Sequence, residues 1–311
     1  MKRAQSASPC EHRVRIATVA IAFLTAAFLP LAHAAGTLDR VRDAGKVNLG
    51  YRADARPFSF KDESGNAVGY SVALCQKIVD QVKTDLKLPT LNVVWVPVTL
   101  EGRFQDVQQG RVDLLCGADT ETLARRKEVS FSIPVFPGGI GAMLRADSSF
   151  RLRDVLLKGR QAGPFWRASP AEILQRQVFA AVPGTTAERW LGSRLNDLQI
   201  DSKVVSVPSY DAGVKSVLDR TANVFFGDRA ILLDLAKRSP AAGDLIVLDR
   251  RFTMEQIALA LPRGDDDFRL VVDATLSRFF GTAEFRALYT KWFGEPDADA
   301  LAFFRSSGLP D

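Results

Sequence analysis

The chain has 311 residues, of which 47% are hydrophobic and 25% charged, and its formal net charge is +5. Residues 1–34 contain four Lys and Arg, one Glu and both histidines, so the rest of the chain has a net charge of only +2 and no histidine. A nearly neutral chain gives no electrostatic support for nucleic-acid binding. Residues 35–311 also cannot build a Ser-His-Asp or Cys-His mechanism, or a histidine-containing zinc site.

The N-terminal segment has the three parts of a secretory signal peptide. Four basic residues precede an apolar run at residues 16–31, and Ala32, His33 and Ala34 form an A-x-A cleavage site. We predict that residues 1–34 are removed and that the remaining chain is exported. An uncleaved anchor helix is the alternative, although the apolar run is shorter than the ~20 residues that a spanning helix needs.

Strand and helix patterns alternate from residue 46 onward. In the first part of the chain we predict elements at residues 46–51, 72–86, 91–98, 103–109 and 112–117, with a hairpin-like stretch after the first strand. The glycine-rich passage at residues 134–144 is extended and suits a crossing between two lobes. Alternation of this kind is typical of a largely parallel α/β sheet.

A second α/β unit follows this passage. Its predicted strands and helices lie at residues 151–158, 178–182, 184–194, 203–209, 210–220, 223–227 and 230–238. Residues 252–264 are suited to the return crossing, and two amphipathic helices follow at residues 266–280 and 282–294. We therefore predict a first lobe formed by residues 35–138, a second lobe at 139–252, and completion of the first lobe by 253–311.

The stretch at residues 116–134, CGADTETLARRKEVSFSIP, has the features of a carboxylate receptor. A buried strand leads into a tight turn, after which Thr122 can cap a helix that has Arg125 at its third position. Unpaired backbone N–H groups, the hydroxyl of Thr120 and a guanidinium together favour a small anion. Because the stretch contains no catalytic base or nucleophile pair, it indicates binding rather than chemistry.

Two cysteines remain after residues 1–34 are removed. Cys75 lies in a predicted amphipathic helix and Cys116 at a strand end. In an oxidising compartment an even pair is compatible with one disulfide, and two buried free thiols are the alternative. Two cysteines are too few for a structural zinc site, and we expect no metal and no cofactor.

In order and spacing, several segments resemble the periplasmic solute-binding proteins of ABC amino-acid importers, the bacterial extracellular solute-binding proteins of family 3. The resemblance is nearest to the glutamate/aspartate-binding branch and covers essentially the whole chain after residue 34. The segments are GYRADARPFSF (50–60), VGYS (68–71), VPVTLEGRFQDVQQGRVDLLCGADTETLARRKEVSFS (96–132), PGTTAE (183–188), FFGD (225–228) and YTKWF (289–293).

This resemblance implies a type II, Venus-flytrap fold, in which two α/β lobes are joined by two crossing strands. It implies a monomer in the periplasm that traps a ligand by hinge closure and delivers it to a membrane permease, with no nucleic acid involved. The α-carboxylate of an amino acid is then assigned to Arg125, Thr120, Thr185 and Thr186. The α-ammonium is assigned to Asp228, with the carbonyl of Gly117 or Ala118 nearby.

The family positions also assign Arg52 and Arg103 to the side-chain carboxylate of an acidic amino acid. Considered without the family, the two residues could instead be surface arginines that pair with Asp54 or Glu101. Three departures from the branch concern the pocket wall: Leu100 and Gly102 replace polar residues, and Ala118 replaces a serine. Tyr210 occupies the position of a histidine that reaches the ligand, so a different acid or an amino-acid derivative is an open alternative.

Two other function classes are alternatives. An enzyme on the same scaffold, such as a dehydratase of cyclic carboxylates, would need a general acid or base in the cleft. The sequence offers no histidine there, and Asp228 is the acidic residue that we expect in the cleft. A secreted ligand sensor that acts through a partner is the third possibility. We expect a binding protein and not an enzyme.

Overall fold

The computed structural model describes residues 36–158 and 170–310. The predicted signal peptide at residues 1–34 lies outside the described residues. Among the described residues, no helix is long and apolar enough to cross a membrane.

Six strands form the first sheet, in the order β5-β1-β6-β14-β7 with β8 paired to β14. Their bounds are β1 (Lys46–Arg52), β5 (Asn92–Val98), β6 (Leu114–Thr120), β7 (Ser130–Phe131), β8 (Phe136–Gly138) and β14 (Glu255–Leu261). Strands β1, β5 and β6 are parallel, whereas β14 runs antiparallel to its neighbours. Residues 257–261 of β14 are all fully buried, as expected for a strand covered on both faces.

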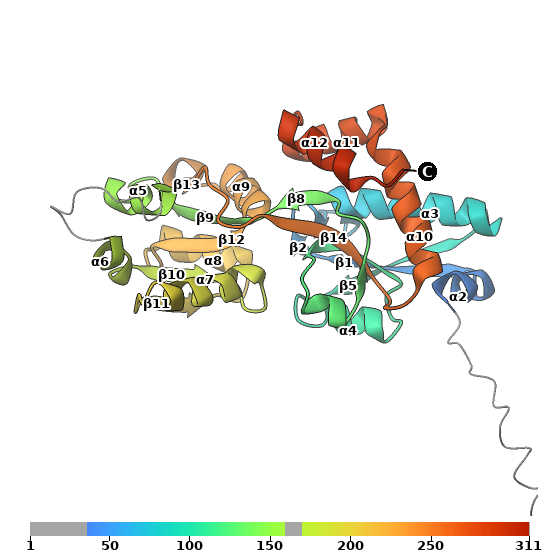
Figure 1. Ribbon diagram of the computed structural model, residues 1–311, viewed down its shortest axis with the longest axis horizontal. Helices are drawn as coiled ribbons and strands as arrows, with labels where there is room; N and C mark the ends of the chain where they lie inside the picture. The colour runs from blue at the N-terminus through green and yellow to red at the C-terminus, as the bar shows by residue number, and fades with distance from the viewer. Residues whose placement is uncertain (1–35, 159–169, 311) are drawn as a thin grey trace, which may run out of the picture. The chain divides into compact units, whose positions relative to one another are not determined.

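Helices α3 (Tyr70–Leu86) and α10 (Asp266–Phe280) pack against each other beside this sheet (Figure 1). Leu74, Ile78 and Val82 recur every four residues and form part of the buried face of α3. Cys75 of α3 and Cys116 of β6 are joined by a disulfide, with their Cα atoms 6.1 Å apart. The helix is thereby linked covalently to the strand that leads into the predicted carboxylate receptor.

Smaller elements complete this part of the fold. They are α2 (Thr37–Ala44), β2 (Asp54–Ala55), β3 (Ser59–Lys61), β4 (Ala67–Val68), α4 (Arg103–Gln108) and the 3-10 helix η1 (Arg125–Lys127). The three short strands form a separate antiparallel sheet, which corresponds to the predicted hairpin-like stretch.

The second sheet has five strands in the order β11-β10-β12-β9-β13. Its strands are β9 (Ile140–Arg145), β10 (Val178–Ala181), β11 (Lys203–Ser206), β12 (Val224–Asp228) and β13 (Leu245–Val247). Its helices are α5 (Phe150–Lys158), α6 (Pro170–Gln175), α7 (Thr186–Asp197), α8 (Tyr210–Leu218), α9 (Arg229–Arg238) and η2 (Ala242–Asp244). Strand β11 ends before the predicted residue 209 because Ser209 caps α8 and accepts the N–H of Ala212.

The chain passes from the first sheet to the second between β8 and β9, and returns before β14. Figure 1 shows β8 and β14 beside each other, and they pair antiparallel. Between β8 and β9, Gly139 has φ +154°, and a Cβ there would lie 2.2 Å from the carbonyl oxygen of Thr253. Only glycine allows the two passages to approach this closely.

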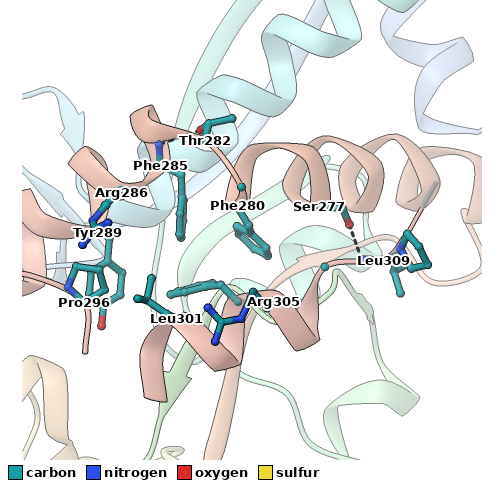
Figure 2. Close-up of a pocket in the computed structure, with 14 residues that line it drawn as sticks. Ser277, Phe280, Thr282, Phe285, Arg286, Tyr289, Pro296, Leu301, Arg305 and Leu309 are labelled. Carbon is teal, nitrogen blue, oxygen red and sulfur yellow. Dashed lines mark hydrogen bonds between the residues drawn. The ribbon is translucent and has the colours of Figure 1, made fainter. Parts of the chain in front are cut away.

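Three helices end the chain: α10, α11 (Ala283–Phe293) and α12 (Ala298–Ser307). The sequence pattern predicts the first two but not α12, whose first turn is capped by Asp297. Figure 2 shows a pocket between these helices, where Phe280 and Phe285 lie over α12. The rings of Phe280 and Phe285 contact Phe304 at centroid distances of 5.1 and 4.7 Å.

Candidate ligand-binding site

The carboxyl end of β6 leads directly into the turn that presents Arg125. Thr122 Oγ1 accepts the backbone N–H of Arg125 at 3.2 Å, as a capping hydroxyl does. The prediction that Arg125 holds the third position of a helix is wrong, since Arg125 begins the three-residue 3-10 helix η1. Strand β7 starts at Ser130, which leaves room for a single turn.

The guanidinium of Arg125 is buried and turns back toward β6. It donates to the carbonyl oxygen of Thr120 at 2.7 Å and to that of Gly184 at 3.3 Å. Among the described residues no carboxylate lies within ion-pair distance of it. Burial, and then repulsion from Arg103, lower the pKa of Arg125 to about 10. Arg125 is therefore a desolvated cation that forms no direct ion pair with a carboxylate of the described chain.

Asp228 has the opposite arrangement. It ends β12 and caps α9, where its Oδ1 accepts the N–H groups of Ala230 and Ile231 at 2.9 and 3.3 Å. In the part of the chain that the structure describes, no Lys or Arg forms an ion pair with it. Burial raises the pKa of Asp228 to about 7, and the charge of Glu255 contributes to the rise. A cation beside this carboxylate would stabilise its ionised form.

Glu255 connects the two ends, and the sequence analysis missed it. Its Oε2 accepts the hydroxyls of Thr120 at 3.1 Å and Thr186 at 2.8 Å, and its Oε1 accepts that of Thr253 at 2.9 Å. The same carboxylate acts electrostatically on both Arg125 and Asp228. Two of the hydroxyls predicted to bind a carboxylate are thus brought together on one carboxylate of the protein.

The hydroxyl of Thr185 is used within its own helix start. It donates to the carbonyl oxygen of Val182 at 2.7 Å and accepts the N–H of Glu188 at 3.2 Å. The Glu188 side chain accepts the N–H of Gly184 at 2.8 Å, which completes a reciprocal cap. Thr185 therefore shapes the start of α7, while Thr186 presents its hydroxyl to Glu255.

Arg52 and Arg103 are both buried, with side chains 4% and 5% exposed, so the alternative that they are surface arginines is wrong, although its pairing of Arg52 with Asp54 is confirmed. Arg52 pairs with Asp54, donating from Nη2 to both carboxylate oxygens at 2.7 and 2.8 Å. Arg103 does not pair with Glu101. Its Nε donates to Oδ1 of Asp119 at 2.5 Å.

Asp119 is the second acidic residue that the sequence analysis missed, although it lies inside the stretch singled out as the receptor. Its side chain is 1% exposed, and in the described chain its Oδ2 has no hydrogen-bond partner. A Cβ on Gly117 would lie 2.3 Å from this oxygen, so Gly117 leaves the space that the carboxylate occupies. Besides Asp228, two further carboxylates thus lie beside residues predicted for the site: Asp119 contacts Arg103, and Glu255 contacts Thr120 and Thr186.

The ring of Phe104 lies near the guanidinium groups of both Arg103 and Arg125. The Cζ atoms of Arg103 and Arg125 are 4.1 and 5.4 Å from its ring centroid. Both are within the range of cation–π attraction. The ring thus holds two arginines close enough for the charge of Arg103 to affect the pKa of Arg125.

Tyr210 lies beside Asp228. Its Oη accepts the backbone N–H of Asp228 at 3.4 Å, and burial raises the pKa of its phenol to about 12. Gly227 makes room for the ring, because a Cβ there would lie 2.8 Å from it. Ala118 is half-buried and packs against the largest hydrophobic cluster, which includes residues beside both sheets. Leu100 packs there as well, whereas Gly102 precedes α4.

The sequence matches the bacterial extracellular solute-binding proteins, family 3, over residues 47–295. It is 28% identical over 282 residues to the L-glutamate/L-aspartate-binding protein of Pseudomonas aeruginosa, covering 90% of this chain and 87% of that protein. It is 26% identical over 264 residues to the glutamate/aspartate import solute-binding protein of Salmonella typhimurium, covering 85% of this chain and 81% of that protein.

Among solved structures, the fold is similar to that of the ancestral amino acid-binding protein AncCDT-1, a precursor of cyclohexadienyl dehydratase. The TM-score is 0.67 at 24% identity, and the match covers 83% of this chain and 100% of that chain. At this identity the likeness concerns the fold alone. The predicted two-lobed α/β fold is confirmed.

Proposed function

Because the chain belongs to the bacterial extracellular solute-binding proteins of family 3, we propose that it captures an acidic amino acid as its zwitterion and delivers it to the permease of an ABC importer. One observation carries this proposal: among the described residues, Arg125 is a buried cation without a carboxylate, and Asp228 is a carboxylate without a cation. An α-amino acid supplies the missing partner at both ends. We place its α-carboxylate at Arg125 and its α-ammonium at Asp228.

The strength of such binding follows from charge-assisted hydrogen bonds, each of which contributes roughly 1.5–3 kcal/mol. Arg125 can offer a planar guanidinium to a carboxylate, which is the geometry of its strongest pairs. Three or four such contacts, after the costs of ordering, support about micromolar affinity, which corresponds to roughly −8 kcal/mol.

The acidic class is supported by two features. Relatives at 28% and 26% identity are named for glutamate and aspartate. Arg52 and Arg103 are buried arginines, and the charge of Arg103 acts on Arg125. We place the side-chain carboxylate of the ligand at these two arginines, with Tyr210 and Ala118 on the walls. Gly117 and Ala118 lie in the part of β6 where its pairing with β14 is irregular, and we assign their carbonyl oxygens to the α-ammonium as further acceptors.

Binding without turnover, in the periplasm, is the role that fits these relatives, because they are named as binding proteins. We propose that residues 1–34 direct export and are then removed. Residues 35–138 and 253–311 form one lobe and residues 139–252 the other. The paired passages that contain Gly139 and Thr253 are the hinge about which the lobes close on the ligand.

A thermal-shift screen of the purified protein tests the proposal, since a ligand that binds the folded state raises the melting temperature. L-Glutamate and L-aspartate are expected to raise it, and succinate and glutarate, which lack the ammonium group, are expected to have no effect. Stabilisation by these dicarboxylates but by no amino acid would contradict the zwitterion assignment. Consumption of a stabilising ligand in a turnover assay would contradict the binding role.

A further inference from the structure

We propose that Asp119 is a specificity-determining residue, whose buried carboxylate cancels the charge of Arg103 so that the site accepts the uncharged amide of an acidic amino acid as well as the acid. The inference rests on the proposed function and names its substrate class more closely. The expected ligands are amino acids with a carboxylate or a carboxamide at the end of the side chain, such as glutamate and glutamine.

The three arginines of the site differ in how their charge is balanced. Arg125 has no carboxylate partner among the residues that the structure describes, so its charge is available to a ligand. Arg103 is already paired with Asp119 at 2.5 Å, and Arg52 with Asp54 at 2.7 Å. The end of the site that we assign to the ligand side chain therefore contains two cations and two internal anions.

The two internal anions are not equivalent. The side chain of Asp54 is 51% exposed, so solvent screens its charge and it can turn away from Arg52. The side chain of Asp119 is 1% exposed and lies in the space left by Gly117, which gives it no route to solvent. In this position solvent screens its charge only weakly, so it acts on a group placed beside Arg103. A ligand carboxylate there is attracted by Arg103 and repelled by Asp119.

The second oxygen of Asp119 points to the same conclusion. In the described structure Oδ2 is buried and accepts no hydrogen bond. No donor therefore offsets the negative charge at this oxygen, so Asp119 repels a ligand carboxylate placed at Arg103. A carboxamide offers an oxygen to Arg103 without adding a second negative charge. The Arg103–Asp119 pair thus matches a carboxamide in charge.

Calorimetric titration of L-glutamate and L-glutamine into the protein tests this, because the two ligands have the same shape and differ in charge. For the wild-type chain we expect the glutamine Kd to lie within about tenfold of the glutamate Kd. Asp119→Asn keeps the shape of the side chain and removes its charge. We expect this variant to shift the ratio of the two Kd values toward glutamate by about tenfold or more, which corresponds to about 1.4 kcal/mol.

Asp106→Asn is the matched control. Asp106 lies on the same helix as Arg103 but pairs with Arg111, so the same chemical change should leave the ratio within about twofold of wild type. A purely structural role of Asp119 would weaken both ligands alike in Asp119→Asn, and an unchanged ratio overturns the inference. If Asp119→Asn does not fold, a wild-type preference for glutamate of more than about a hundredfold overturns it as well. Failure of every amino acid to bind would instead overturn the proposed function, and the inference with it.

Discussion

The hydroxyl of Thr186, at the start of α7, donates to Oε2 of Glu255, at the start of β14, at 2.8 Å. The same oxygen accepts the hydroxyl of Thr120 from the end of β6 at 3.1 Å. A carboxylate of the protein thus occupies the hydroxyls that we assign to the α-carboxylate of a ligand. An arriving ligand must share or displace these hydrogen bonds, and it meets a like charge as it does so.

Replacing Glu255 by Gln is therefore expected to tighten amino-acid binding by about threefold to tenfold, because the charge is lost while an acceptor remains for both hydroxyls. Calorimetric titration measures the change. Glu121→Gln serves as the control, since Glu121 pairs with Arg126 and is outside the cluster of hydroxyls. Weaker binding in Glu255→Gln would mean that the carboxylate positions Thr120 and Thr186 rather than competing with the ligand.

Asp228 combines a helix cap with the proposed ammonium site, and two substitutions separate these roles. Asp228→Asn keeps the cap of α9, because asparagine caps as well as aspartate does, but loses the charge. We expect its affinity for amino acids to fall by about a hundredfold or more, with little loss of thermal stability. Asp228→Ala should lose binding and also about 1 kcal/mol of stability. Unchanged affinity in either variant, measured by calorimetry, would make the ammonium assignment wrong.

The raised pKa of Asp228 predicts a pH dependence of binding. Its pKa is about 7 in the ligand-free protein, and only the ionised carboxylate can pair with an ammonium group. As the pH falls below 7, a growing fraction of the protein is protonated at Asp228, so the apparent Kd should rise by up to about tenfold per pH unit. Above pH 7 the Kd should be nearly constant. A flat profile between pH 5 and 8 would contradict the assignment, and Asp228→Asn should show no such slope.

The helices and strands were largely predictable because their signals are local. Helix α10 runs from Asp266 to Phe280 as predicted, since Asp265 caps it and buried apolar residues recur at helical spacing. Helix α12 was missed because its fully buried face consists of Ala300 and Phe304, which is too small to give a clear pattern. The predicted helix with Arg125 at its third position is only the 3-10 turn η1, because strand β7 begins within a few residues of Arg125.

The acidic residues of the site were not predictable from local patterns. Arg103 and Asp119 are 16 residues apart and meet only because α4 and β6 pack together. Glu255 and Thr120 are 135 residues apart and meet because β14 pairs with β6. A sequence pattern identifies Arg103 as a candidate, but only the fold reveals that its charge is balanced inside the protein.

The Cys75–Cys116 disulfide should stabilise the folded protein by lowering the conformational entropy of the unfolded chain. It links residues 41 positions apart, and a loop of that length corresponds to roughly 4 kcal/mol in the chain-entropy account. We expect the Cys75→Ala/Cys116→Ala double variant to unfold at clearly lower urea concentration than the oxidised wild type. Reduction with a thiol should lower the wild-type midpoint and leave the double variant unchanged. Equal midpoints for oxidised and reduced wild type would show that the bond adds nothing.

Arg52→Ala tests the proposed side-chain end of the site independently of Asp119. Arg52 is buried and its partner Asp54 is half-exposed, so its positive charge is only partly balanced where we place the ligand side chain. Its removal should lower the affinity for glutamate by roughly threefold to fivefold more than the affinity for glutamine. The reason is that the uncharged amide is not attracted by the charge of Arg52. Arg56→Ala is the control, because Arg56 pairs with Asp234 and is 36% exposed. Equal losses of affinity for glutamate and glutamine in Arg52→Ala would show that Arg52 does not recognise the ligand side chain. Arg52 would then be only a structural partner of Asp54.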